Sequence, residues 1–322
     1  MKENFNPDLY HGKNKRKNFF EGWYFKIVDK KNNYKLAIIP GVSYGHEEYD
    51  SHCFIQIING KDFNYLSYDI ENFKYNNSKF RICINSNIFT LESMSLSISH
   101  NNLSIYGNLI FKNLIKWPNS IINPGSMGFY NYLKFMECYS QVCAINGSIV
   151  GSLNINGIHT DFTGGKIYIE KNWDKSFPKS WLWIQSNSFK NRKVSVSCSI
   201  GTIPFPIKTF TCFIIGVTLE NDFYSFTTIN NSKINIKHFG DDICLTVSKN
   251  NLKLTIKTFT NKKDFLTLKT PNKGSMNSTT KETINGEVYM LLEDTKLNKK
   301  IFEDIGLSAG VEYGGNFCEL FK

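Results

Sequence analysis

Arginine is scarce in this sequence. The chain of 322 residues has 38 lysine and arginine residues and a formal net charge of +10, yet only Arg16, Arg81 and Arg192 are arginines. Bidentate phosphate contacts and direct readout of bases favour arginine over lysine. The positive charge therefore does not indicate a nucleic-acid-binding protein, and we interpret the basic run at residues 13–17 as a solvated segment.

Several motifs of catalysis and targeting are also missing. The sequence has no Gly-x-Ser-x-Gly elbow, and Gly164-Gly165 stands alone without a phosphate-binding loop around it. No apolar run is long enough for a membrane-spanning helix, and the polar N-terminus does not resemble a signal peptide. We therefore expect a cytoplasmic protein without a cofactor or transmembrane segment. Its expected partner is a hydrophobic small molecule, and transient contact with a membrane surface is compatible with this.

The cysteines form no metal or disulfide pattern. None of the eight belongs to a Cys-x-x-Cys pair. Most lie in apolar or alternating runs, namely Cys53, Cys83, Cys198, Cys212 and Cys244. In a reducing compartment they should be free thiols that pack as small apolar side chains. His46 and His52 lie near two glutamates, but the spacing fits no standard metal site, so we expect no metal.

Alternation of apolar and polar residues recurs along the chain. Residues 194–200 alternate with serine, and residues 252–256 alternate with lysine and threonine. Turn signals separate such segments at roughly the 8–12-residue spacing of sandwiches and barrels. They include Asn101-Asn102, Asn156-Gly157, Asn230-Asn231, Asn250-Asn251 and Asn285-Gly286. The pattern predicts an all-β protein made of antiparallel strands.

Two segments depart from the alternation. Leu297, Ile301 and Ile305 are spaced by four residues, and Gly306 could end a helix. We predict one C-terminal α-helix over residues 297–305, before the last strand. Residues 113–129 form a loop longer than a hairpin needs, and we expect this loop to cover the mouth of a barrel.

Tryptophans suggest that the fold is repeated. Trp23 lies on the first strong strand of the N-terminal half, and Trp181 and Trp183 lie on the first strong strand that follows it. We predict two lipocalin-like antiparallel barrels or sandwiches in tandem, residues 1–175 and 176–322; one large irregular β-sandwich is the alternative. Trp23 and at least one of Trp181 and Trp183 should then be buried, because a tryptophan on the first strand closes such a barrel.

Four segments resemble the tocopherol cyclase family. They are residues 18–26 (NFFEGWYFK), 124–129 followed by 135–139, 164–185 and 311–315, spread over nearly the whole chain. The resemblance implies a lipocalin-like fold, related to carotenoid hydratases and to pericyclase-type enzymes of two barrels. It also implies ring closure of a prenylated quinol, in which an acid protonates an alkene and the phenol oxygen captures the tertiary cation.

Four carboxylates are candidates for the proton donor. Glu170 and Asp174 flank Trp173, and burial there would raise the pKa of a carboxyl toward neutrality. Glu137 and Glu21 are the next candidates, each beside aromatic residues. The aromatic residues expected to line the substrate cavity are Trp23, Tyr24, Tyr139, Trp173, Trp181 and Trp183.

Simpler interpretations stand beside these roles. Glu170 could pair with Lys171 or Lys26, Asp174 could cap a turn, and Glu21 could be a strand-edge carboxylate paired with a lysine. Alternation also allows Glu137 to point to solvent. The leading hypothesis is a cyclase or isomerase of a hydrophobic isoprenoid or polyketide. A non-catalytic lipocalin-like carrier, or a structural β-protein with filled barrels, would need no buried acid.

Overall fold

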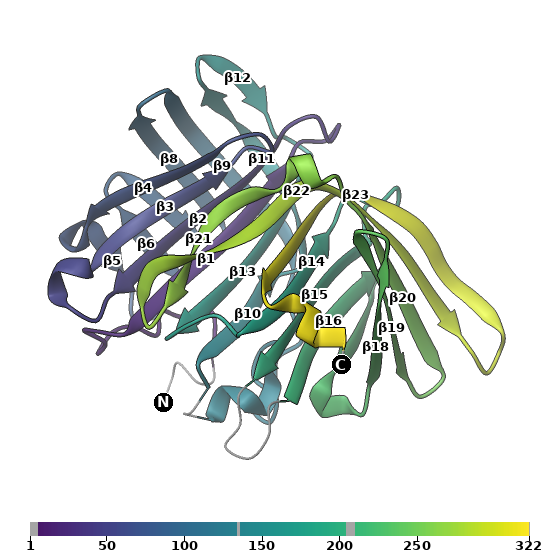
Figure 1. The fold of residues 1–322 in the computed structure, drawn as a ribbon. Coiled ribbons are helices and arrows are strands. Elements are labelled where there is room, and N and C mark those ends of the chain that lie inside the picture. The colour runs from purple at the N-terminus through teal and green to yellow at the C-terminus, as the bar shows by residue number, and fades with distance from the viewer. Residues whose placement is uncertain (1–5, 134–135, 204–209, 322) are drawn as a thin grey trace. The chain divides into compact units, whose positions relative to one another are not determined.

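The computed structural model describes residues 6–133, 136–203 and 210–321 of the chain (Figure 1). Within these residues the regular elements are β-strands and short 3-10 helices, with no α-helix. The packing divides the chain into two compact units. Unit 1 comprises Met1–Phe177 and Leu268–Thr279, and unit 2 comprises Pro178–Thr267 and Thr280–Lys322. The predicted all-β antiparallel fold is confirmed, while the predicted boundary at residue 175 stays a prediction.

Unit 1 contains one large antiparallel sheet. Its strands are β1 Phe19–Val28, β2 Lys35–Tyr44, β3 His52–Ile58, β4 Phe63–Asp69, β5 Phe73–Tyr75, β6 Arg81–Ile84, β7 Asn87–Thr90, β8 Ser93–His100, β9 Leu103–Ile115, β10 Cys138–Ala144, β11 Asn146–Ile155, β12 Ile158–Asp161 and β13 Lys166–Asp174. The strand order is β4-β3-β2-β1-β13-β11-β9-β8-β7-β6-β5, with β10 also paired to β13. The pairing of β1 with β13 joins the strands that carry Trp23 and Trp173.

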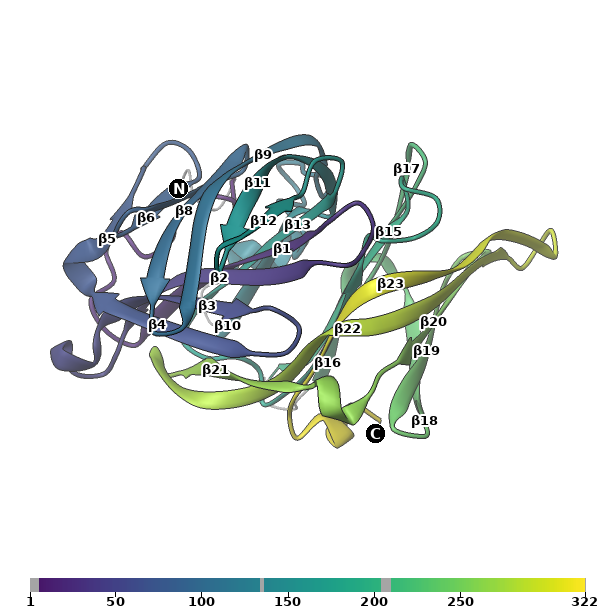
Figure 2. The ribbon, with the colours of Figure 1, turned by 90° about the horizontal axis from the view of Figure 1, so that it is seen from above.

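Unit 2 contains a second antiparallel sheet. Its strands are β14 Ser180–Ser186, β15 Ser195–Ile203, β16 Phe210–Leu219, β17 Asp222–Thr227, β18 Lys233–Phe239, β19 Asp242–Lys249, β20 Leu252–Phe259 and β23 Lys299–Gly315, together with most of β22 Ser275–Asp294. The order is β17-β16-β15-β14-β23-β22-β20-β19-β18. Figure 2 shows β22 and β23 as a long hairpin, and β21 Leu266–Asn272 pairs with the start of β22. The alternating segment at residues 252–256 lies in β20, as predicted. The segment at residues 194–200 lies in β15 except for its first residue, which precedes the strand.

Each unit has its own apolar core. In unit 2 the core gathers inward-facing residues of most strands, including Ile184, Val196, Ile215, Leu245, Leu254, Met290 and Val311. In unit 1 the core includes Trp23, Phe25, Ile38, Phe89, Leu109 and Ile169. Trp23 is fully buried and Trp183 is 5% exposed, which confirms the prediction of one buried tryptophan on the first strand of each unit.

The α-helix predicted over residues 297–305 is wrong. A turn at residues 295–298 joins β22 to β23, and Asp294 Oδ1 accepts the backbone N–H of Leu297 at 2.9 Å. Asn298 adopts a φ of 48°, as tight turns require. A spacing of four is even, so it places residues on one side of a strand as well as on one side of a helix. Leu297 and Ile305 are exposed, so their spacing does not mark a core face.

Asparagine ends strands at most of the expected turns. Asn101, Asn156, Asn231 and Asn250 all have positive φ, which asparagine tolerates better than most residues. The turn predicted at Asn285-Gly286 is wrong, because β22 continues through it with shifts of register around Gly286. An extra residue in one strand produces such a β-bulge and bends the strand.

Two further features concern helices and cysteines. Within the described ranges, none of the short helices has the length or apolar character needed to cross a bilayer. The seven cysteines whose side chains the structure describes have free thiols. Burial raises the pKa of the Cys198 and Cys143 thiols, with the carboxylate of Asp8 adding to the rise at Cys143. These two thiols are therefore un-ionised packing groups.

Candidate functional site

The pairing of β1 with β13 decides which side chains share a face. Glu21 lies opposite Trp173, and Trp23 lies opposite Lys171. Successive side chains of a strand point to opposite faces, so these four residues lie on one face of the sheet. That face holds the buried Trp23 and Phe25, and therefore looks into the interior of unit 1.

Glu21 and Lys171 form a fully buried ion pair. Both side chains are 0% exposed, and Lys171 Nζ contacts Glu21 Oε1. The backbone N–H of His11 donates to Glu21 Oε2 at 2.8 Å, and His11 Nδ1 lies 3.1 Å from Lys171 Nζ. Lys171 also donates to the carbonyl of Leu9. Residues 9–11 thus close this His11–Glu21–Lys171 cluster from one side.

The cluster keeps Glu21 ionised. Burial by itself would raise the pKa of Glu21, because it penalises the charged form. The charge of Lys171 and the hydrogen bonds from His11 and Lys171 outweigh burial and hold the pKa below its ordinary value. At neutral pH Glu21 is therefore a carboxylate. It can stabilise a positive charge or accept a proton, but it is poorly suited to donate one.

Aromatic rings surround the cluster. The His11 ring stacks on Trp173 with centroids 4.1 Å apart and planes inclined by 6°. Tyr139 stacks against Trp173 as well, at 5.4 Å and 13°. Lys171 Nζ lies 4.6 Å from the ring centre of Trp173 and 5.4 Å from that of Trp23. Aromatic faces attract cations, so this environment favours positive charge.

Asp174 is the last residue of β13, directly after Trp173, and the charges of His11 and Glu21 act on its carboxyl. Its φ of 115° is unusual for a residue other than glycine, and its side chain is only 15% exposed. Burial raises the pKa of Asp174, and the negative charge of Glu21 adds to the rise. Lys15, whose Nζ is 3.9 Å from Asp174 Oδ1, opposes it. The carboxyls of Asp174 and Glu21 therefore have pKa values shifted in opposite directions.

Glu170 lies on the other face of β13. It is opposite Tyr24 of β1 and is 5% exposed. The Tyr168 hydroxyl donates to its carboxylate, and Asn172 Nδ2 donates to Oε1 at 3.2 Å. The structure thus separates Glu170 from Trp173, which faces the interior. Its pairing with Lys171 is ruled out by the same alternation, since Lys171 faces Glu21.

Glu137 is exposed, at a bend before β10. Its carbonyl accepts the backbone N–H groups of Lys175 at 2.9 Å and Ser176 at 3.1 Å. Its main chain thus ties the end of β13 to the start of β10, while its side chain lies in solvent. The exposed position agrees with the interpretation in which the side chain of Glu137 points to solvent.

The other two predicted aromatic residues lie in unit 2. Trp183 packs over Gly310 of β23, and Trp181 packs over Gly314 of the same strand. A Cβ at either glycine would lie 2.4 Å or less from an indole atom, so only glycine leaves room for the rings. Trp181 and Trp183 therefore belong to a different unit from Trp23, Tyr139 and Trp173. Their predicted role toward a substrate stays a prediction.

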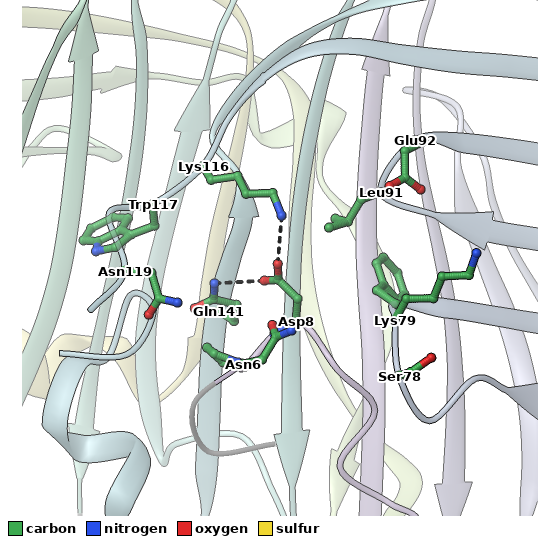
Figure 3. A pocket seen from close by; sticks show the side chains of 12 residues that line it. Asn6, Asp8, Ser78, Lys79, Leu91, Glu92, Lys116, Trp117, Asn119 and Gln141 are labelled. Carbon is green, nitrogen blue, oxygen red and sulfur yellow. Dashed lines mark hydrogen bonds and ion pairs between the residues drawn. The ribbon is translucent and has the colours of Figure 1, made fainter. Parts of the chain in front are cut away.

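A pocket of about 430 Å³ opens in unit 1 near the cluster (Figure 3). Its lining residues are Asn6, Pro7, Asp8, Ser78, Lys79, Phe80, Leu91, Glu92, Lys116, Trp117, Asn119 and Gln141. Its volume is in the range of small-molecule sites. Trp117 and Asn119 come from the long loop that the sequence places over a barrel mouth. None of the lining residues is one of the six aromatic residues expected to line a substrate cavity, and that expectation stays a prediction.

Asp8 contacts two other residues that line the pocket. Its Oδ1 accepts from Gln141 Nε2 at 3.1 Å, and its Oδ2 lies 3.2 Å from Lys116 Nζ. Gln141 is held in turn by the backbone N–H of Ser126, which donates to Oε1 at 2.9 Å. Gln141 lies opposite Lys171 in the pairing of β10 with β13. The pocket and the buried cluster are therefore connected through adjacent residues.

Sequence reasoning missed His11, Lys171 and Asp8 as site residues. Alternation offered one available signal, because it places Lys171 on the face of Trp173 and away from Glu170. Nothing local in the sequence places His11 or Asp8 beside residues of β13 and β10. No group of three or more histidine, cysteine or acidic side chains in the described part of the chain could hold a metal ion.

The comparisons with known proteins agree with this fold. A model of the family described as tocopherol cyclase-like matches residues 99–315, so the chain belongs to the tocopherol cyclase-like family. A probable chloroplastic tocopherol cyclase of Oryza sativa subsp. japonica is 29% identical over 103 residues, 31% of this chain and 22% of that protein. The chloroplastic tocopherol cyclase of Zea mays matches to the same extent. The match thus spans about a fifth of the length of these plant relatives.

Solved structures resemble the whole chain. The crystal structure of CghA has a TM-score of 0.60 at 7% identity, over 93% of this chain and 89% of that one. Kievitone hydratase from Nectria haematococca has a TM-score of 0.54 at 11% identity, over 95% and 94%. At such low identity these likenesses show the fold alone. They confirm the prediction of two lipocalin-like antiparallel units.

Proposed function

We propose that this protein is a cyclase or isomerase that acts on a prenylated quinol, or on a related hydrophobic isoprenoid or polyketide, by acid catalysis. Membership of the tocopherol cyclase-like family supports the reaction class. The plant relatives are named tocopherol cyclases, and one structural neighbour is named a hydratase. In this proposal, ring closure and hydration are both additions to an alkene that begin with transfer of a proton.

The observation that supports this proposal best is that the pKa values of Asp174 and Glu21, two carboxyls that interact through their charges, are shifted in opposite directions. Where environments push two such values apart, one group suits the acid role and the other the role of a permanent anion. The raised pKa of Asp174 favours proton donation, and the lowered pKa of Glu21 keeps a negative charge close by. The stacked rings of Trp173 and Tyr139 add faces that attract a cation.

In the proposed reaction Asp174 protonates the alkene, and a C–H bond forms while the π bond breaks. The tertiary carbocation is stabilised by the Glu21 carboxylate and the neighbouring aromatic rings. A hydroxyl oxygen of the substrate then forms the new C–O bond, and its proton returns to the Asp174 carboxylate. Substrate and product are isomers, so no co-reactant is consumed. Glu170, buried on the other face of β13, is the alternative donor, and exposed Glu137 has no role in this scheme.

The experiment is turnover of a prenylated quinol, followed by chromatographic separation of the cyclised isomer. Asp174→Asn should lower turnover at least about 100-fold, the usual contribution of a general acid. Asp161→Asn, which changes an exposed carboxylate of the same unit, is the matched control and should keep parental turnover. Full activity of Asp174→Asn would exclude Asp174, and Glu170→Gln would then test the alternative donor. If the parent bound the quinol but never converted it, the protein would be a carrier.

A further inference from the structure

A tight bend between β9 and β10 holds two isoleucines in solvent. Ile121 and Ile122 are each 78% exposed. Two hydrogen bonds fix the bend: the Ser120 N–H donates to the Asn123 carbonyl at 3.1 Å, and the Asn123 N–H donates to Ser120 Oγ at 3.0 Å. Gly, Pro, Asn, Asp and Ser dominate such bends for conformational reasons, which do not account for two isoleucines. Their exposure therefore calls for another explanation.

An aromatic residue contacts this bend, and two more lie close to that residue in sequence. The Tyr132 hydroxyl donates to the Ile121 carbonyl at 2.5 Å. Phe129 and Tyr130, in the 3-10 helix Gly128–Tyr132, have ring centroids 4.6 Å apart, and Phe129 is 44% exposed. Tyrosines are enriched at the level of lipid headgroups, where one end of the ring is apolar and the hydroxyl is wet. A bend with two exposed isoleucines and tyrosines close by in sequence has the composition of a membrane-contacting loop.

Lysines lie next to the same loop. Trp117 and Asn119 line the pocket in unit 1 and lie just before the isoleucines in sequence. Lys79 and Lys116 line this pocket too, and Figure 3 shows them on opposite sides of it. Lys79 is exposed, and the Lys116 side chain is 51% exposed although it contacts Asp8. Lysines beside a membrane-contacting loop complement anionic lipid headgroups.

We propose that Ile121, Ile122 and Phe129, here named the apolar tip, insert into the surface of an anionic lipid bilayer. Tyr132 then lies at the level of the headgroups, and the two lysines face the lipid phosphates and carboxylates. The mouth of the pocket comes close to the membrane, so a hydrophobic ligand can leave the bilayer without crossing water. The contact does not depend on catalysis.

Co-sedimentation with vesicles tests the contact. With vesicles of phosphatidylcholine and phosphatidylserine, the double variant Ile121→Ser/Ile122→Ser should bind at least about tenfold more weakly than the parent, because two aliphatic side chains no longer enter the bilayer. The matched control is Ile110→Ser/Val150→Ser, which changes two directly paired side chains of β9 and β11 that are each 44% exposed. This control should bind as the parent does.

The contribution of lysine charge to vesicle binding is tested separately. Lys79→Gln should weaken binding to the mixed vesicles about fivefold and leave binding to pure phosphatidylcholine unchanged, since one lysine near an anionic surface contributes about that much. Hydrogen exchange of the parent should slow in residues 117–132 when mixed vesicles are added, a readout that needs no variant. The proposal is wrong if the parent does not bind the mixed vesicles, or if both double variants lose binding equally. It is also wrong if the tip variant changes only self-association of the protein.

Discussion

The His11 ring stacks on Trp173 with ring centroids 4.1 Å apart. The two residues are far apart in sequence, and their contact places the N-terminal segment against β13, an interior strand of the sheet in unit 1. The same segment donates a backbone N–H to Glu21 and accepts a hydrogen bond from Lys171 at Leu9. The segment is therefore part of the candidate site as well as a cover for it.

Removal of Lys171 should be strongly destabilising. Lys171→Met leaves Glu21 as a buried carboxylate without its cation, which typically costs about 3–5 kcal/mol. The control Lys112→Met removes an exposed lysine of β9 and should change stability by less than about 0.5 kcal/mol. Chemical denaturation at neutral pH measures both. The double variant Glu21→Gln/Lys171→Met should recover part of the loss, and no recovery would contradict direct coupling of the pair.

Acid should weaken the fold through Glu21. The pKa of Glu21 is lowered in the folded state, so its stabilising contribution is complete above its ordinary value of 4.5 and is lost as the pH falls below that value. Glu21→Gln should therefore flatten the dependence of unfolding free energy on pH below about pH 4.5. Denaturation curves at several acidic pH values measure this slope. Equal slopes for parent and variant would show that Glu21 is not held in its ionised form.

Asp174→Asn should stabilise the protein at neutral pH. The folded-state pKa of Asp174 is raised, so its ionised form is disfavoured in the fold, and this cost is present above the folded pKa and relieved as the pH falls through it. Asparagine tolerates the positive φ at this position. We expect a melting temperature about 2 °C above the parent at pH 7, and a smaller difference near pH 4. A lower melting temperature at pH 7 would show that the carboxylate stabilises the fold.

Trp23→Ala should destabilise unit 1 by about 3–5 kcal/mol. The indole is fully buried, and its ring stacks on Phe80 at 5.7 Å. Tyr49→Ala removes a large aromatic ring that is 86% exposed in the same unit, and should have little effect. Thermal melts of both variants measure the difference. Similar melting temperatures for the two variants would contradict the role of Trp23 in the core.

Much of the architecture could be predicted from local sequence patterns. Alternation with a period of two identified strands such as β15 and β20, because the side chains of a strand alternate whatever lies beside it. The same pattern failed at Leu297, Ile301 and Ile305, because a spacing of four fits a strand face and a helix face equally well. Only the pairing of β22 with β23 across the turn at residues 295–298 distinguishes the two.

The sequence alone determined the all-β architecture, a buried Trp23 and the presence of acids beside tryptophans. The tertiary structure decided which acids and tryptophans share a face. The pairing of β1 with β13 places Glu21 beside Lys171 and Trp173, while Glu170 faces the other way. Such partners depend on which distant strand becomes a neighbour and in what register, and a register shift of one residue would reverse every face. That choice is made by the packing of the whole core, which no short stretch of sequence contains.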